Sequence, residues 1–311
     1  MKQKIRDIAA QLESVYPKDE ALSLAWWIAE ELSGLSRTQL QFGCKDTTFL
    51  ANTQTIIDRL LHFEPIQYIF EHTLWCGLDL KVTPATLIPR PETAELVEEI
   101  DRLRLTEHRP SATDRAQTDH VSLRVLDVGT GSGCIAIALK KRHPEWQVTG
   151  IDISPEAIEV ARENARRNNV DVEFFVADIL GTKEENPFNF LILTERLFQF
   201  STFNLIVSNP PYICNKEKKD MRPNVLDYEP HTALFVPDSD PLLFYRRIAE
   251  LYARNPSPVT CNPSQKHLFF EINEAYPAEV SAMLDELGYT DIQITKDIYG
   301  KPRIIEARMA H

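Results

Sequence analysis

Polar residues that could do chemistry stand directly after an apolar run in the second half of the chain. Asn209-Pro-Pro-Tyr212 follows FNLIV at 203–207, which is typical of a buried strand in a parallel sheet. The two prolines carry no backbone N–H, so strand pairing must stop there. The side-chain oxygen of Asn209 and the carbonyl of Pro210 are two stiffly held acceptors, suited to the two N–H groups of an amide or amino nitrogen. A rigid turn without chemistry would also explain these residues.

The rest of this corner would form a pocket around that nitrogen. Pro211 stiffens the acceptors, and the ring of Tyr212 offers a flat face on which a planar amide or a base could stack. An amide nitrogen is a poor nucleophile because its lone pair is conjugated with the carbonyl. A site of this kind must therefore orient and polarise the nitrogen.

A glycine loop lies earlier in the chain, after the apolar run 123–128. Glycines there let the chain turn sharply and let a ligand approach the backbone. The spacing is G-x-G-x-G, not the G-x-G-x-x-G of dinucleotide folds, and Asp127 would repel a pyrophosphate. S-adenosylmethionine carries an ammonium, a sulfonium and no phosphate, so it fits better. The candidate cofactor residues of this segment are Asp127, Gly129, Thr130, Gly131, Ser132 and Gly133, and Asn209 is a further candidate for contact with the cofactor.

Two further carboxylates stand at predicted strand ends. Asp152 is placed to hold two ribose hydroxyls, and Ser154 before Pro155 is the better N-cap of the next helix, which leaves Asp152 for a ligand. Asp178 and Ile179 are candidates for the adenine, with a carboxylate for the exocyclic amine and an apolar side chain for the ring. A solvated strand-end aspartate is an equal alternative for Asp178.

The elements that must position these residues alternate between strand and helix. We expect strands at 123–128, 147–152, 172–177, 203–208 and 267–272, and helices at 134–142, 155–168, 241–254 and 277–287. This order predicts an α/β fold with a mostly parallel sheet that is covered on both faces. The final segment, DIQITKDIYGKPRIIEAR, predicts a closing antiparallel hairpin. The fourth strand should lie beside the first, at the point where such sheets bind ligands.

The chain divides into three parts by pattern. Residues 1–72 have helical periodicity and predict a small helical bundle, 73–120 predict a linker of β-hairpin, helix and loop, and 121–311 predict the catalytic domain. Residues 108–120 and 255–265 predict surface loops, and 181–200 an insertion to which we assign no chemistry.

Composition excludes several classes of function. The net charge of −12 argues against a protein that coats DNA or RNA, and it would suit a basic protein partner. No apolar run approaches the roughly 20 residues that span a bilayer. The five scattered cysteines form no Cys-x-x-Cys pair, which predicts a reducing cytoplasmic location and no metal site.

The ordered motifs resemble those of class I S-adenosylmethionine-dependent methyltransferases that act on exocyclic or amide nitrogens. EPIQYIF at 64–70, LIPRPETAELV at 87–97 and DIYGKPRIIEAR at 297–308 narrow the resemblance to the PrmC/HemK family of peptide chain release factor glutamine methyltransferases. VLDYEPHTALF at 225–235 is also similar and is expected to form a loop over the site. The chain departs from the family at 70–72, where glycine is common, and in the length of 181–200.

The resemblance implies a methyl transfer from S-adenosylmethionine to the glutamine N(5) of the Gly-Gly-Gln motif in bacterial class 1 release factors. It implies a cofactor loop at 129–133, Asp152 at the ribose, Ile179 at the adenine, and Asn209, Pro210 and Tyr212 at the substrate amide. The segment 89–93 would wall the site or seat the helix that follows. The alternatives are an adenine-N(6) methyltransferase acting on DNA or RNA, and a scaffold protein without activity, which should carry a damaged loop or corner.

Overall fold

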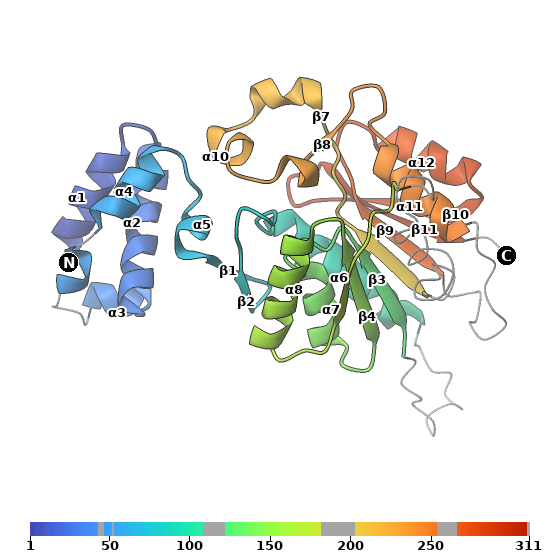
Figure 1. Ribbon diagram of the computed structural model, residues 1–311, viewed down its shortest axis with the longest axis horizontal. Helices are drawn as coiled ribbons and strands as arrows, with labels where there is room; N and C mark the ends of the chain where they lie inside the picture. Colours follow the sequence, from blue (N-terminus) through green and yellow to red (C-terminus); the bar gives the residue numbers. More distant parts are fainter. Residues whose placement is uncertain (43–46, 52, 108–121, 182–202, 254–265, 310–311) are drawn as a thin grey trace. The chain divides into compact units, whose positions relative to one another are not determined.

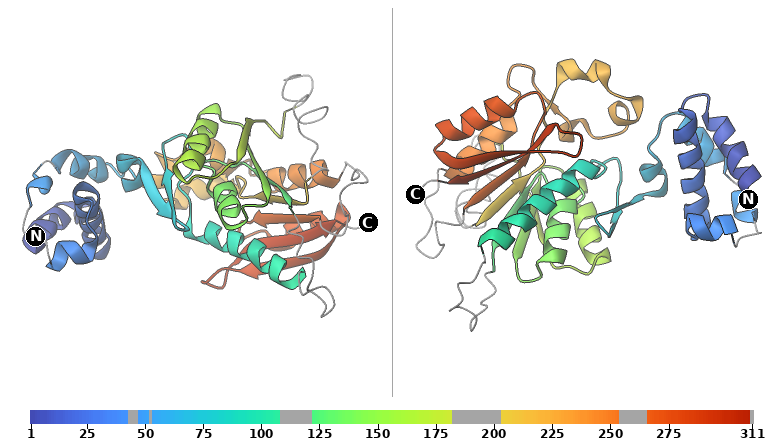
Figure 2. Two further views of the ribbon diagram at one scale, coloured as in Figure 1. Left: turned by 90° about the horizontal axis from the view of Figure 1, so that it is seen from below. Right: turned by 180° about the vertical axis from the view of Figure 1, so that it is seen from behind.

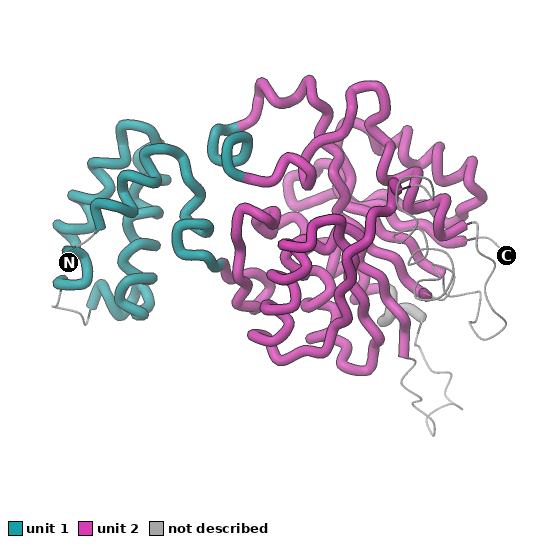
Figure 3. The backbone as a smooth tube through the Cα atoms, viewed as in Figure 1, with its two compact units in different colours: residues 1–72, 222–228 teal, residues 73–221, 229–311 magenta. Residues whose placement is uncertain are grey.

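The computed structural model describes the chain except for residues 43–46, 52, 108–121, 182–202, 254–265 and 310–311. The predicted loops at 108–120 and 255–265 and nearly all of the predicted insertion at 181–200 lie outside the described residues. The chain forms two compact units (Figure 3). The first unit comprises residues 1–72 and 222–228, and the second unit comprises residues 73–221 and 229–311.

The first unit is a helical bundle with its own core. Its helices are α1 (Lys2–Leu12), α2 (Lys18–Ser33), α3 (Arg37–Phe42), α4 (Gln54–Leu61), α5 (Ile66–Phe70) and the 3₁₀ turn η1 (Thr48–Leu50). Their buried aliphatic residues, such as Ile5, Leu12 and Ile28, belong to one core that also contains Trp26. The apolar spacing of residues 1–72 therefore corresponds to the buried faces of amphipathic helices.

A short segment from later in the chain completes the first unit. It contains α10 (Pro223–Leu226). The Tyr228 hydroxyl donates to the backbone oxygen of His62 at 2.7 Å, and the Arg222 guanidinium lies 3.3 Å from the carboxylate of Glu20. The sequence pattern gave no sign of this association.

The second unit opens with the predicted hairpin and helix. β1 (His72–Trp75) pairs with β2 (Leu78–Lys81), and α6 (Pro91–Glu107) follows. Leu78 and Leu80 are buried while Asp79 between them is exposed, as alternation predicts. The Trp75 indole N–H donates to the Arg90 backbone oxygen at 2.8 Å, which fixes the entry to α6 on the hairpin.

A seven-stranded sheet in the order β10-β11-β9-β6-β3-β4-β5 forms the centre of this unit (Figure 1). Its strands are β3 (Arg124–Val128), β4 (Gln147–Asp152), β5 (Glu173–Val176), β6 (Leu205–Ser208), β9 (His267–Glu271), β10 (Tyr289–Lys296) and β11 (Pro302–Met309). The first five are parallel, and β11 joins β9 and β10 antiparallel. The predicted parallel sheet and closing hairpin are confirmed, and the predicted strands and helices end within two residues of the observed ones.

Helices cover both faces of the sheet (Figures 1 and 2). On one face α6, α7 (Cys134–Arg142) and α8 (Pro155–Arg167) pack on β-strand residues such as Val125, Leu205 and Phe269. On the other face α11 (Leu243–Ala253) and α12 (Pro277–Glu286) pack on Leu126, Ile206 and Phe270. Neighbouring strand residues thus enter opposite cores, which makes the strands apolar throughout.

β3 lies between β4 and β6 in the sheet. The chain runs outward from β3 through β4 to β5 and then crosses to β6 on the other side of β3, so the strand order reverses at β3. This confirms that the strand before Asn209 lies beside the first strand. Ser208 and Val128 are paired there, and the Ser208 hydroxyl donates to the Val128 carbonyl at 2.6 Å. Beyond β6 the chain forms β7 (Ile213–Cys214), η3 (Asn215–Asp220), η4 (His231–Ala233) and β8 (Phe235–Val236). No helix in the described part is long and apolar enough for a membrane span.

Candidate active site

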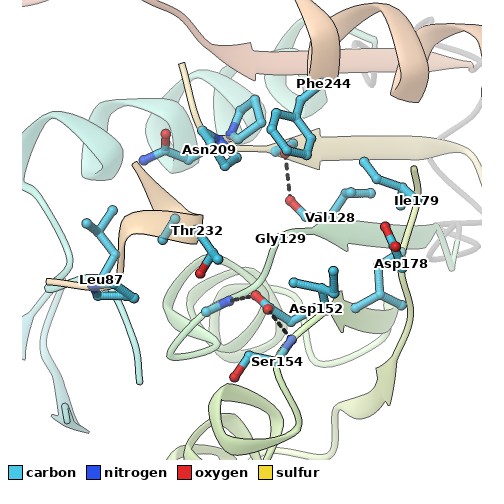
Figure 4. Close-up of a pocket in the computed structure, with 18 of the residues that line it drawn as sticks. Leu87, Val128, Gly129, Asp152, Ser154, Asp178, Ile179, Asn209, Thr232 and Phe244 are labelled. Carbon is cyan, nitrogen blue, oxygen red and sulfur yellow. Dashed lines mark hydrogen bonds between the residues drawn. The ribbon is translucent and has the colours of Figure 1, made fainter. Parts of the chain in front are cut away.

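A cavity of about 320 Å³ opens at the carboxyl ends of β3, β4, β5 and β6 (Figure 4). Its lining comes from those strand ends, from Ala85–Leu87 of the linker and from η4 with α11. Two carboxylates, Asp152 and Asp178, line it, and the described lining residues include no lysine or arginine. The cavity therefore disfavours a phosphate-bearing ligand and suits a ligand with positive charge.

The glycine loop after β3 forms the floor of the cavity. Gly129 and Gly131 line it, and both have positive φ angles of 71° and 54°, which residues with a Cβ rarely adopt. The backbone N–H groups of Gly129 and Thr130 both donate to the Ile151 carbonyl at 2.9 Å. These bonds tie the loop to the end of β4. Thr130, Ser132 and Gly133 do not line the cavity, so their predicted cofactor contacts stay predictions.

Asp127 lies beneath this loop and not on the cavity wall. Its side chain is fully buried, and Oδ2 accepts hydrogen bonds from the Thr130 hydroxyl at 2.6 Å and the Ala136 N–H at 3.2 Å. Its Oδ1 has no partner among the described residues. Burial raises the pKa of Asp127 to about 7. Asp127 therefore shapes the loop from below, and its predicted contact with a cationic ligand stays a prediction.

Asp152 lines the cavity at the end of β4. One carboxylate oxygen accepts the Gly131 N–H at 2.8 Å, and the other accepts the Ser154 N–H at 2.9 Å. Each oxygen keeps a lone pair for a further donor. Burial raises the pKa of Asp152. The Ser154 hydroxyl accepts the Ala157 N–H at 3.1 Å, which confirms that Ser154, and not Asp152, caps α8.

Asp178 and Ile179 lie on one side of the cavity, and Asn209 lies on the other (Figure 4). One oxygen of Asp178 accepts the Leu180 N–H at 2.9 Å. Ile179 presents an apolar surface to the cavity from the same segment. This pair can hold a flat, amine-bearing ring, and its assignment to the adenine stays a prediction.

The Asn-Pro-Pro-Tyr corner ends β6 at the other end of the cavity. Asn209, Pro210 and Pro211 line the cavity, whereas Tyr212 does not. The Asn209 Nδ2 donates to the Thr93 hydroxyl at 3.1 Å, and no described residue donates to its Oδ1. The Tyr212 hydroxyl donates to the buried carboxylate of Glu271 at 3.1 Å. Its ring packs against the core beside α11 and α12, so the predicted stacking on a substrate stays a prediction.

The segment before α6 supports the site from the linker side. Leu87 lines the cavity, while residues 88–93 do not. Arg90 instead forms an ion pair with Glu229, whose second oxygen accepts the Ile88 N–H at 3.2 Å. The segment after Glu229 contributes Thr232 and its neighbours to the cavity wall, so residues 230–235 of the predicted loop lie at the site. Residues 225–228 of that loop belong to the first unit instead.

Sequence reasoning missed several residues of this site. Leu87, Thr232 and Phe244 line the cavity, and the sequence predicts no individual role for any of them. Leu87 and Thr232 lie in the segments 87–97 and 225–235 that carry the family resemblance, whereas Phe244 lies in no motif. Thr93 lies in the segment 89–93 that is predicted to wall the site or seat the following helix, and its hydroxyl contacts Asn209. Glu271 contacts Tyr212, and nothing in its local sequence distinguishes it from an ordinary strand-end glutamate. Only the pairing of β9 with β6 brings Glu271 to the same sheet edge.

Comparison with solved structures shows the fold. A crystal structure of the hMettl16 catalytic domain in complex with MAT2A 3′UTR hairpin 6 has a TM-score of 0.52 and 14% identity, over 76% of this chain and 77% of that one. A family model described as a methyltransferase domain matches residues 119–235. The strand order and glycine loop described above belong to this fold.

Curated relatives match almost the whole chain. A release factor glutamine methyltransferase of Bacteroides thetaiotaomicron is 40% identical over 304 residues, which cover 96% of this chain and 97% of the relative. One of Flavobacterium psychrophilum is 39% identical, over 95% and 94%. One of Lactococcus lactis is 34% identical over 98% of each chain. The chain belongs to the release factor glutamine methyltransferase family.

Proposed function

We propose that the chain transfers a methyl group from S-adenosylmethionine to the side-chain amide nitrogen of the glutamine in the Gly-Gly-Gln motif of class 1 release factors. The observation that carries the proposal is the Asn209 carboxamide. Its Nδ2 is engaged by Thr93, and it stands beside Pro210 at one end of an acidic cavity. Family membership at 40% identity supports the same activity.

The residues present fit the cofactor. The cavity lining offers carboxylates and no cationic side chain, which suits an ammonium and a sulfonium. Asp152 would hold the ribose hydroxyls through its free lone pairs, and Asp178 with Ile179 would hold the adenine. Gly129 and Gly131 leave the backbone open to close approach. When bound, S-adenosylmethionine supplies an electrophilic methyl group on a good leaving group.

The substrate amide is bound by two oxygens of the corner. Asn209 Oδ1 accepts one N–H of the glutamine side chain, and the Pro210 carbonyl accepts the other. Because both acceptors are fixed by the prolines, the amide nitrogen is oriented before reaction, which lowers the entropic part of the barrier. As the nitrogen gains its fourth bond it becomes positive, and the same two oxygens stabilise that charge. The nitrogen then loses one of its protons to water, and the sulfonium would leave as the neutral thioether of S-adenosylhomocysteine.

The first unit is our candidate for docking the release factor. It has a separate helical core, and none of its described residues lines the cavity. The net charge of −12 suits a basic protein partner. We also place the protein in the cytoplasm, where release factors act.

The proposal is tested with purified protein and methyl-labelled S-adenosylmethionine. A bacterial class 1 release factor, the same factor with the motif glutamine replaced by alanine, and double-stranded DNA are offered separately. We expect label only in the intact release factor, with one added methyl group on the motif glutamine by peptide mass spectrometry. Label in DNA, or no label in the release factor, would reject the proposal and, in the first case, favour an adenine methyltransferase.

A further inference from the structure

We infer that Thr93 and Glu271 are positioning residues that set which atom of the Asn209 carboxamide faces the substrate. The inference rests on the proposed function, because it concerns the amide that binds the glutamine. It adds two residues that do not line the cavity and that act through Asn209. Their contacts form one chain of hydrogen bonds from a buried carboxylate to the corner.

Three elements distant in sequence supply this chain. Glu271 ends β9, where the register pairs Ser208 of β6 with Phe270, so Glu271 and Asn209 reach the same sheet edge. Thr93 lies in the first turn of α6. Glu271 is 1% exposed and Thr93 is 2% exposed, so water does not compete for these bonds.

The distances place each donor and acceptor. The Thr93 hydroxyl lies 2.6 Å from Glu271 Oε2, and Asn209 Nδ2 lies 3.1 Å from Thr93 Oγ1. The other carboxylate oxygen of Glu271 accepts the Tyr212 hydroxyl at 3.1 Å. One carboxylate therefore anchors both ends of the Asn-Pro-Pro-Tyr corner, directly at Tyr212 and through Thr93 at Asn209.

The single hydroxyl proton of Thr93 determines the orientation of the Asn209 carboxamide. An ionised carboxylate only accepts hydrogen bonds, so Thr93 must donate its single proton to Glu271. The Thr93 oxygen can then offer only lone pairs to Asn209, and the amino group of the carboxamide must face it. The carbonyl oxygen Oδ1 is left for the substrate. Without Thr93 the carboxamide could turn over and present two N–H groups to a substrate that also has only N–H groups there.

Both oxygens of Glu271 accept a hydroxyl proton, one from Thr93 and one from Tyr212, which is the hydrogen-bond pattern of an ionised carboxylate. Burial raises the pKa of Glu271, whereas the hydroxyls of Thr93 and Tyr212 and the charge of Arg303 oppose that rise. The N-terminal turn of α6 adds a positive partial charge next to the carboxylate.

The test replaces the Thr93 hydroxyl. Thr93→Val keeps the shape and removes the link, and Thr93→Ser restores the hydroxyl. As a control, Thr149→Val makes the same change at another buried threonine, in β4, which is 7% exposed. We expect kcat for release-factor methylation to fall about 10- to 100-fold in Thr93→Val, with KM changed little. Thr93→Ser and Thr149→Val should stay within about threefold of wild type.

Binding and stability are measured beside the kinetics. Affinity for S-adenosylhomocysteine by calorimetry should be unchanged in Thr93→Val, since Thr93 does not line the cavity. Equal kcat losses in Thr93→Val and Thr149→Val, or no rescue by Thr93→Ser, would overturn the inference. A wild-type protein that labels no release factor would instead reject the proposed function, so the two failures are distinguishable.

One measurement does not depend on the folding of any variant. Neutron diffraction from deuterium-exchanged wild-type crystals locates the amide deuterons of Asn209. We expect them on the atom that faces Thr93. Deuterons on the opposite atom would overturn the inference whatever the kinetics show.

Discussion

The guanidinium of Arg90 lies 2.6 Å from the carboxylate of Glu229, whose side chain is only 1% exposed. Glu229 also accepts the Ile88 N–H. It therefore connects the linker segment before α6 to the loop that begins after Glu229. Burial raises the pKa of Glu229, and the nearby charge of Arg90 opposes that rise. The ion pair thus gives a buried carboxylate a cationic partner beside the wall of the cavity.

Arg90→Met should destabilise the protein, because Glu229 would remain buried without its cation. We expect a loss of about 1–3 kcal/mol in the free energy of unfolding, measured by urea denaturation. Arg246→Met is the matched control, because its ion pair with Asp240 is more exposed, and it should cost less than about 1 kcal/mol. Adding Glu229→Gln to Arg90→Met should recover part of the loss. Equal losses for Arg90→Met and Arg246→Met would contradict this account.

Asp152→Asn should weaken cofactor binding. The amide cannot accept the Gly131 and Ser154 N–H groups while also receiving two ribose hydroxyls. We expect the dissociation constant for S-adenosylmethionine to rise about 10- to 100-fold by calorimetry. Asp171→Asn makes the same change at an exposed position of the second unit and should leave affinity unchanged. Unaltered binding in Asp152→Asn would remove this residue from the cofactor site.

Asn209→Ala should abolish catalysis and spare the cofactor. It removes a substrate acceptor, so single-turnover methylation should slow at least about 100-fold, while affinity for S-adenosylmethionine stays within about threefold. Asn215→Ala, which loses a 3.1 Å bond to the Val236 carbonyl elsewhere, serves as the control. Full activity of Asn209→Ala would be incompatible with the assigned role.

Asp127 should give the stability of the protein a measurable pH dependence. Its pKa is about 7 in the folded chain and about 3.9 when unfolded, so between pH 4 and pH 7 the folded state binds the extra proton. Stability contributed by this group is therefore lost as pH rises through that window. Asp127→Asn does not titrate, and relative to wild type it should gain up to about 4 kcal/mol between pH 4 and pH 8.

Urea denaturation at intervals across that pH range checks the prediction. Asp171→Asn, at an exposed aspartate, should show a constant difference from wild type. A constant difference for Asp127→Asn as well would show that Asp127 is ionised throughout, with an unseen partner for its Oδ1.

The sequence predicted much of the fold because local pattern determines it. Alternating apolar runs and glycine turns located β3, α7 and β4 closely, and Pro155 after Ser154 located the start of α8. The sequence also locates Asn209 and Asp152 at the cavity, because parallel sheets bind ligands at the carboxyl ends of their strands.

The remaining features depend on contacts between distant segments. Glu271 is 178 residues from Thr93, and Glu229 is 139 residues from Arg90. Neither pair has a spacing that a sequence pattern could report. The sequence predicts Tyr212 as a stacking surface. It cannot show that the Tyr212 hydroxyl donates to Glu271, because that contact depends on where β9 ends.

Residues 222–228 belong to the first unit although they lie late in the chain, and this determines where the protein can be divided into fragments. A gene cut after codon 72 would yield a helical fragment without Tyr228 and Arg222, and a second fragment in which both residues have lost their partners. The boundary that looks natural in the linear sequence therefore divides a folded body. Fragment studies would need to supply those seven residues to the helical part, for instance by grafting them onto its carboxyl end.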